Sequence, residues 1–509
     1  MLFNSIEFAF FLPIVFLLYW FVFDYALSKC KHQLWLQNLF IVVASYIFYG
    51  WWDWRFLILI AITSFCSWGS GLLIGRREGD GAKEKNTPYT LHLTQKPIFW
   101  PRFWLISNII LNLSILGVYK YYDFFAREFA DLFGIESDFL LLHLILPVGI
   151  SFYTFQALSY SIDVYRGHIQ PTKDIVAFTA FLSFFPQLVA GPIERATNLL
   201  PQFQRKRTFD YAQAVDGMRQ ILWGLFKKIV IADNCAVYVD QVWATYDTQS
   251  GSTLLLAAIL FTFQIYGDFS GYSDIAIGTA KLFGIKLMRN FNVPYFSRDI
   301  AEFWRRWHIS LTTWFRDYVY IPLGGSRPNI PEAIRLKGDK ALEARYTKCI
   351  AVRNTFVIFL LSGFWHGANW TFVLWGAYHA LLFVPLLLMG KNRRYVYQKI
   401  NASEWPRMLF TLVLVMVGWV LFRTPSIADA WGYICGICSM SIWSIPSLIT
   451  DYLLWFTLLM IVLMIVVEWR GRERDTAPLP HNRWVYYAIV LLIYWFATDK
   501  TTEFIYFQF

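Results

Sequence analysis

Charged residues are scarce in this sequence. Asp, Glu, Lys and Arg make up 16% of its 509 residues, against about 25% in ordinary soluble proteins. A soluble chain of this length would need several polar domain surfaces, and this chain has too little charge to cover them. The composition therefore excludes a protein built from soluble domains.

Cysteine and several common catalytic motifs are also lacking. Six cysteines in 509 residues do not make a disulfide framework. Cys435 and Cys438 have the spacing of a redox or metal-binding pair, but no second pair accompanies them, so we expect them to be ordinary, dispensable packing residues. The sequence has no phosphate-binding glycine loop, HExxH or GxSxG motif. ATP-driven transport and serine-hydrolase chemistry therefore lack support, and no metal site is predicted.

Long apolar runs are what the sequence does contain. Hydrophobic residues make up 57% of the chain and aromatic residues 20%. Since a spanning helix takes about 20 residues, the charge-free runs predict an all-α polytopic membrane protein with roughly eleven or twelve spanning helices. Some runs are short enough to be re-entrant. The runs are Phe8–Phe23, Gln33–Trp52, Phe56–Gly75, Phe103–Tyr119, Phe139–Ile162, Ile175–Ile193, Thr248–Gly267, Thr355–Gly390, Met408–Phe422, Ala430–Thr450, Tyr452–Val467 and Trp484–Thr498.

The basic residues are best explained by membrane topology. The formal net charge is +10, from 45 basic and 35 acidic residues. Such an excess is typical of cytoplasmic loops, so we expect a lipid bilayer and no nucleic acid as partner. Glu7 precedes the first apolar run and Lys29 follows it, which predicts an uncleaved anchor with its N-terminus outside. Because successive spanning helices place their loops on alternate sides of the membrane, the loop Arg76–Arg102 is then expected in the cytoplasm.

His366 is the first candidate for chemistry. It lies about 16 Å from the start of the charge-free run Thr355–Gly390, close to the bilayer midplane. An ionisable group at that depth is costly and usually functional, and His suits general base catalysis. The alternative is a neutral His hydrogen-bonded between helices. Gly363 and Gly367 flank it and allow a neighbouring backbone or a ligand to approach closely.

His308 is the second candidate. It lies in an aromatic and basic segment, Arg298–Tyr320, which predicts an amphipathic or re-entrant helix that is buried or interfacial. The tryptophans and arginines of that segment fit an interfacial belt with snorkelling side chains. That explanation does not require His308, which we expect to be brought toward His366.

Other ionisable residues have structural explanations. His379 follows His366 by 13 residues, a spacing that turns a straight helix by about 220° after whole turns, which disfavours paired haem ligands. We expect His379 to be structural. Asp268 and Asp274 would be the relay of a proton-coupled transporter, but they can equally cap helices or pair with Arg. Gly267 and Gly271 predict a broken helix there.

Five ordered segments carry a resemblance to the membrane-bound O-acyltransferase family. They are similar in particular to the bacterial branch that O-acetylates alginate, other polysaccharides and peptidoglycan. The resemblance runs from the N-terminus to about Gly390, with a core at 1–390 and further membrane helices at 391–509 completing one membrane domain. The segments are Leu146–Gln156, Phe185–Arg195, Tyr266–Gly278, FWRRWHISLTTWFRDYVYIPLGGSR at Phe303–Arg327 and SGFWHGANW at Ser362–Trp370.

The resemblance implies a helical bundle around a cavity or tunnel and acyl transfer from a thioester to a hydroxyl. The catalytic positions of the family map onto His366 and His308. The donor is expected to be acetyl-CoA or an acyl-carrier thioester, with no permanently bound cofactor. The acceptor is expected to be extracytoplasmic polysaccharide or peptidoglycan, reached through a secreted or membrane-anchored partner protein, at the bacterial inner membrane. The further substrate-binding candidates are Trp365, Asn369, Trp307, Arg305 and Arg306.

The sequence leaves three alternatives open. One is D-alanyl transfer to teichoic acid from a carrier protein, within the same family. The second is a proton-coupled transporter that uses Asp268 and Asp274. The third is a sugar-polymer flippase with an aromatic channel, which the 24 tryptophans of the chain could line.

Overall fold

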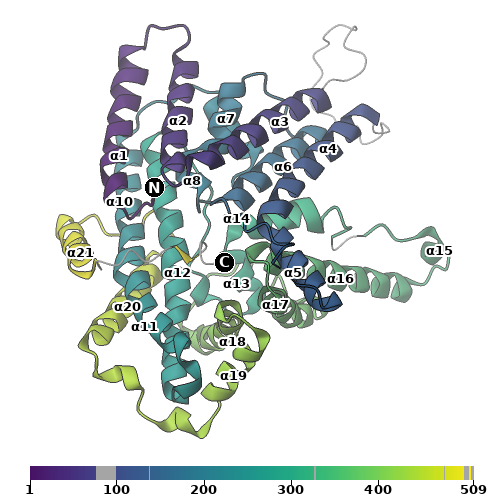
Figure 1. The fold of residues 1–509 in the computed structure, drawn as a ribbon, viewed down its shortest axis with the longest axis vertical. Helices are drawn as coiled ribbons and strands as arrows, with labels where there is room; N and C mark the ends of the chain where they lie inside the picture. The colour runs from purple at the N-terminus through teal and green to yellow at the C-terminus, as the bar shows by residue number, and fades with distance from the viewer. Residues whose placement is uncertain (76–98, 137, 326–327, 475, 498–503, 506–509) are drawn as a thin grey trace. The chain divides into compact units, whose positions relative to one another are not determined.

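The computed structural model describes residues 1–75, 99–136, 138–325, 328–474, 476–497 and 504–505. These residues form helices and connecting segments, with no strand among them (Figure 1). The all-α fold predicted from the sequence is confirmed. The basic segment Arg76–Arg102, predicted to be cytoplasmic, lies mostly outside the described residues.

The chain divides into two compact units. The first contains Met1–Ala214 and Ala280–Leu287, and the second contains Val215–Thr279 and Met288–Phe509. The boundary predicted near residue 390 therefore lies inside the second unit. Both candidate catalytic histidines belong to the second unit.

The first unit holds the helices of the N-terminal part of the chain. Within it α3, α4 and α6 pack against one another (Figure 1). A buried amide joins them: Ser67 on α3 donates to Asn108 Oδ1 on α4, and Asn108 Nδ2 donates to Ser161 on α6. Such side-chain hydrogen bonds hold helices together where water is absent. The helices are α1 Ile6–Leu17, α2 Gln33–Gly50, α3 Leu57–Gly75, α4 Phe99–Leu116, α5 Tyr122–Phe133, α6 Ile150–Arg166, α7 Ile175–Ser183, α8 Phe185–Leu188 and α9 Ala196–Phe203.

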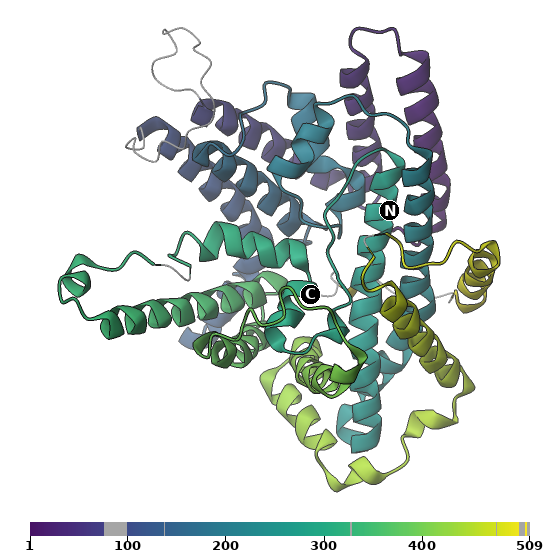
Figure 2. The ribbon, with the colours of Figure 1, turned by 180° about the vertical axis from the view of Figure 1, so that it is seen from behind.

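The second unit is built on α12, the longest helix described. The C-terminal helices α19 to α21 form the yellow-green to yellow end of the ribbon (Figure 2). The first residues of α10 and the last residues of α12 belong to the first unit. The helices of the second unit are α10 Tyr211–Leu225, α11 Asp233–Ala244, α12 Gly251–Leu282, α13 Ile300–Arg306, α14 Ile309–Phe315, α15 Glu332–Arg335, α16 Lys340–His366, α17 Trp370–Leu388, α18 Trp405–Arg423, α19 Ile427–Ile437, α20 Tyr452–Gly471 and α21 Arg483–Phe496.

The glycines of α12 allow close packing. The sequence-based prediction of a broken helix at Gly267 and Gly271 is wrong, because α12 is continuous from Gly251 to Leu282. A Cβ atom on Gly271 would lie 2.8 Å from the carbonyl oxygen of Gly224 on α10, and one on Gly278 would lie 2.5 Å from that of Gly217. The lack of side chains here lets the two helix backbones touch.

Eight helices in the described residues are long and apolar enough to span a membrane, or nine if the bent pair 427–437 and 440–450 counts as one span. This is fewer than the eleven or twelve expected. Some charge-free runs form helices too short to span. The run Ile175–Ile193 contains only the nine residues of α7 and the four of α8, and α21 has 14 residues. The multi-pass membrane character is nevertheless confirmed.

The run Thr355–Gly390 folds into two helices, α16 and α17, which pack against each other. The chain leaves α16 after His366, and Asn369 caps α17 by accepting from the Thr371 amide. Glycine permits the contact: a Cβ on Gly363 would lie 2.1 Å from the Phe372 carbonyl oxygen, and one on Gly376 would lie 2.3 Å from that of Phe359. The close backbone approach expected beside His366 is therefore present.

The segment Arg298–Tyr320 is not one helix, and that prediction is wrong. Its first helix, α13, ends at Arg306, and α14 begins at Ile309. Between them His308 takes a left-handed backbone conformation with φ 44°, which costs energy for a residue with a Cβ. The burial expected for this segment is confirmed, since Trp304, Trp307, His308 and Trp314 are all buried.

Candidate active site

His308 and His366 lie next to each other in the second unit. Their ring centroids are 6.5 Å apart, and the residues are 1% and 5% exposed. The expectation that the chain brings these residues together is confirmed. At this spacing a hydroxyl or a carbonyl group can contact both rings, which are held by different elements, the break before α14 and the last residue of α16.

Asn290 fixes the His308 ring. Asn290 Nδ2 donates to Ser273, so its Oδ1 is an acceptor, and Oδ1 lies 3.0 Å from His308 Nδ1. The Ser310 amide and hydroxyl also donate to Oδ1. His308 Nδ1 therefore carries the proton, and Nε2 is the basic nitrogen. Burial lowers the pKa of His308 to about 3, which keeps the ring neutral at physiological pH.

We expect Asn290→Leu to reduce kcat about tenfold or more, since it removes a hydrogen bond that fixes the tautomer of a buried ring. The variant is compared with wild type by transfer rate across pH and by thermal unfolding. Asn108→Leu, which removes a buried amide of the first unit, is the control and should lose stability while keeping kcat. An unchanged kcat and pH profile in folded Asn290→Leu would contradict the role of this asparagine.

Asn290 and Ser273 could not be recognised as site residues from the sequence. Asn290 lies 18 residues before His308 in an irregular segment, and nothing in its neighbourhood marks it. Only the path of the chain between α12 and α13 brings the amide to the imidazole. The Asn290 side chain is fully buried.

Aromatic rings enclose the two histidines. The Trp365 ring lies 5.8 Å from His308 and 4.9 Å from His366, centroid to centroid. Phe269 of α12 meets the His308 ring edge-on at 4.7 Å, and Trp375 meets that of His366 at 5.3 Å. This apolar environment excludes water and strengthens electrostatic interactions with a bound substrate.

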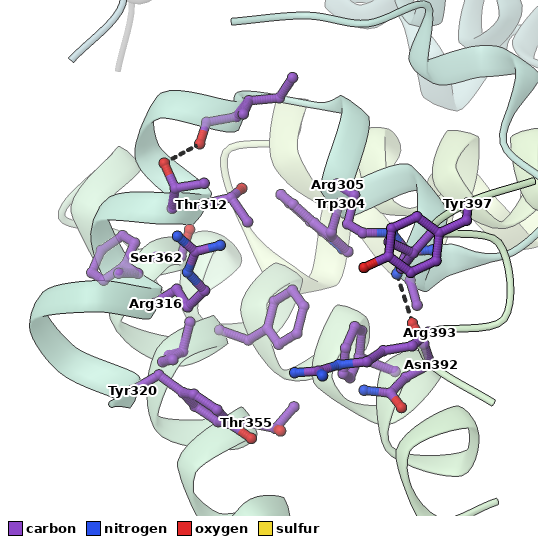
Figure 3. Close-up of a pocket in the computed structure, with 18 residues that line it drawn as sticks. Trp304, Arg305, Thr312, Arg316, Tyr320, Thr355, Ser362, Asn392, Arg393 and Tyr397 are labelled. Atoms are coloured by element: carbon purple, nitrogen blue, oxygen red, sulfur yellow. Dashed lines mark hydrogen bonds between the residues drawn. The ribbon is translucent and has the colours of Figure 1, made fainter. Parts of the chain in front are cut away.

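A cavity of about 640 Å³ opens beside this site, a size typical of ligand pockets. Ile309 and Ser362 line it, one directly after His308 and the other one helical turn before His366. Three arginines also line it; Arg316 forms an ion pair with Asp317 at 2.7 Å, so the positive charge comes mainly from Arg305 and Arg393. Figure 3 shows Arg305 and Arg393 on one side of the cavity and Arg316 on the other.

The other predicted substrate-binding residues have structural contacts. Trp307 is buried and packs on Trp419 at 4.8 Å. Arg306 forms an ion pair with Glu302 at 2.9 Å. The Asn369 Nδ2 donates to the Pro425 carbonyl while its Oδ1 caps α17. Arg305 donates one hydrogen bond to the Asn392 carbonyl and lines the cavity.

The carboxylates considered for a proton relay are paired with lysines. Lys228 Nζ lies 2.8 Å from both Asp233 and Asp268. Lys227 lies 2.6 Å from Asp274. Pairing across helices was expected, but with arginine in place of these lysines. Among the described residues, no group of three or more His, Cys, Asp or Glu is placed to hold a metal ion.

Comparison with known proteins defines the class. The sequence profile of the membrane-bound O-acyltransferase family matches residues 169–333. A probable alginate O-acetylase, AlgI, of Pseudomonas aeruginosa is 37% identical over 452 residues, which cover 88% of this chain and 77% of that protein. The chain belongs to the membrane-bound O-acyltransferase family, and it is an O-acyltransferase.

Two further relatives show the range of acceptors in the family. A peptidoglycan O-acetyltransferase of Helicobacter pylori is 34% identical over 469 residues, covering 87% of this chain and 80% of that protein. A teichoic acid D-alanyltransferase of Bacillus subtilis is 29% identical over 290 residues, covering 55% of this chain and 69% of that protein.

Proposed function

We propose that this protein transfers an acetyl group from a cytoplasmic thioester, acetyl-CoA in the first instance, to an outward-facing hydroxyl. The acceptor belongs to an envelope polysaccharide or peptidoglycan, or to a secreted or membrane-anchored partner protein that completes delivery. The protein acts in the bacterial inner membrane. The observation that carries the proposal is the buried pair His308 and His366 beside a basic cavity.

The proposed reaction needs one base and one oxyanion partner. His366 takes the proton of the acceptor hydroxyl as its oxygen bonds to the thioester carbonyl carbon. The carbonyl becomes a tetrahedral oxyanion, which a nearby N–H group stabilises. The carbon–sulfur bond then breaks, the carbonyl re-forms, and the thiolate takes the proton from His366. The products are the acetyl ester and the free thiol.

His308 and Trp365 are the candidates for the oxyanion partner. Both rings lie within 6.5 Å of the His366 ring, centroid to centroid. His308 in the tautomer set by Asn290 presents Nε2 as a base, so it serves better as a second acceptor that orients the hydroxyl. The indole N–H of Trp365 is a donor and suits the oxyanion.

The cavity supports an anionic donor. Arg305, Arg316 and Arg393 line it, and guanidinium groups bind phosphate oxygens in paired hydrogen bonds. Coenzyme A and a phosphopantetheine arm both carry phosphates and end in the thiol that holds the acyl group. The arginines therefore favour an acyl thioester over an uncharged acyl donor.

The acetyl group and the polymer acceptor are favoured by the relatives. The O-acetylases of alginate and peptidoglycan match at 37% and 34% identity over most of the chain, whereas the D-alanyltransferase matches at 29% over 55% of it. D-Alanyl transfer is the second candidate. A transporter is disfavoured because Asp268 and Asp274 form ion pairs with lysines.

The experiment compares host cells that carry the chain with cells from which it is deleted. Acetate and D-alanine released by mild base are measured separately in the polysaccharide, peptidoglycan and teichoic acid fractions. We expect deletion to remove ester-linked acetate from one polymer fraction and leave D-alanine unchanged. Loss of D-alanine esters instead, or no change in either ester, would overturn acetyl transfer.

A further inference from the structure

His379 is fully buried in α17 among aromatic rings. Its ring lies 5.0 Å from that of Trp304 and 4.9 Å from that of Trp375. Within the described part of the chain, neither nitrogen of His379 has a hydrogen-bond partner, and the same holds for the indole N–H groups of Trp304 and Trp375. The cluster thus gathers four buried polar atoms on three adjacent side chains.

Such a cluster points to a polar occupant. Folded proteins leave few buried polar groups without a partner, because each one loses its hydrogen bonds to water. A neutral imidazole offers one donor and one acceptor, and each indole offers one donor. An amide complements this set: its carbonyl oxygen accepts from the indole N–H groups, and its N–H donates to the imidazole.

The cluster lies between the cavity and the catalytic base. Trp304 lines the cavity (Figure 3). Its ring also lies against that of His379. Trp375 touches both His379 and His366, at 4.9 and 5.3 Å. The histidines are on different helices, because the chain breaks after His366. The angle of about 220° between His366 and His379 was calculated for one straight helix, so it does not apply to these two histidines.

Glycine makes room for this arrangement. A Cβ atom on Gly418 of α18 would lie 2.7 Å from His379 Nε2. Any larger residue at this position would press on the ring, so α18 approaches the imidazole directly. A buried His held this closely by packing alone would be better replaced by an apolar ring, since its two nitrogens gain nothing from an apolar contact.

We propose that His379, Trp304 and Trp375 bind the amide of the donor's arm, and so select thioesters that carry an amide two carbons from the sulfur. A donor entering by the cavity then places its amide at His379 and its thioester carbonyl beside His366. This inference rests on the proposed thioester-to-hydroxyl transfer and adds residues that determine donor specificity.

The test measures acetyl transfer by membranes that contain the full-length chain, from two small donors. S-acetyl-N-acetylcysteamine carries the amide, and S-propyl thioacetate lacks it. The ratio of their kcat/KM values is determined for wild type, Trp304→Phe, Trp375→Phe and His379→Phe. Trp223→Phe, a buried tryptophan of α10 that stacks on Phe226, is the matched control. Thermal unfolding of each variant is recorded in parallel.

We expect wild type and Trp223→Phe to prefer the amide donor by about tenfold or more, as a site built around one or two neutral hydrogen bonds does. The three site variants should lose most of that preference, mainly through KM, and still use the donor without the amide. The same preference for the amide donor in wild type and in all variants would overturn the inference. This holds also if the site variants unfold at a lower temperature but keep that preference. Transfer from neither donor nor acetyl-CoA would reject the proposed function itself.

Discussion

His366→Ala is expected to insert and fold normally and to lose nearly all acyl transfer. Alanine is a good helix former, so α16 should persist to its last turn. General base catalysis typically contributes about 10²–10⁴ in rate, and the product should fall by that factor. The measurement is ester-linked acetate per unit of membrane protein, with the variant's amount and thermal unfolding checked against wild type.

Two companion variants sharpen this result. His366→Gln keeps a hydrogen-bonding side chain but cannot take a proton, so it should be as inactive as alanine. His32→Ala, which removes an exposed histidine of the first unit, should leave transfer unchanged. Transfer in His366→Ala above about a tenth of the wild-type rate would reject the general base, because that loss is below the range for one.

Lys228→Met is expected to destabilise the second unit by about 3–5 kcal/mol, the range for removing one partner from a buried ion pair. Lys228 is 2% exposed and sits between the carboxylates of Asp233 and Asp268. Methionine fills similar volume, but it leaves two buried negative charges uncompensated. The free energy of unfolding is measured by denaturant or heat in one detergent, for variant and wild type together.

A triple variant separates charge from packing. Lys228→Met combined with Asp233→Asn and Asp268→Asn removes all three charges, and we expect it to recover most of the lost stability. Lys399→Met is the surface control, since Lys399 pairs with Glu473 while 83% exposed; it should change stability little. If the triple variant is no more stable than the single one, the charges of the carboxylates are not the cause.

The proximity of His308 and His366 could be predicted from the sequence, but the geometry that holds them could not. Two motifs, whose histidines are 58 positions apart in the sequence, resembled one family, and the resemblance implied a shared site. The left-handed backbone at His308 could not be predicted from the sequence, because only a few per cent of residues other than glycine adopt it, although histidine is among the residues that do so more often. The surrounding Trp and Arg pattern favoured a continuous helix.

The glycines of α12 show why local patterns were insufficient elsewhere. Gly267 and Gly271 lower helix propensity, and from the sequence alone a break was the reasonable prediction. The structure places Gly224 opposite Gly271, so packing against α10 outweighs the local preference. Such pairing is a tertiary property. The same holds for Asn290, whose role depends on which residue it meets after folding.

Strain beside the site has a consequence for heat resistance. Val293 and His308, with φ 41° and 44°, both lie in the segment that carries Asn290 and the break before α14. Each such residue costs about 1–3 kcal/mol, and the packing of the rest of the second unit supplies the opposing free energy. This segment should therefore relax before the bundle melts. On slow warming, the midpoint temperature for loss of acyl transfer should lie several degrees below the midpoint temperature for loss of helix, measured by circular dichroism. Coincident midpoints would show that this segment stays folded until the whole unit unfolds.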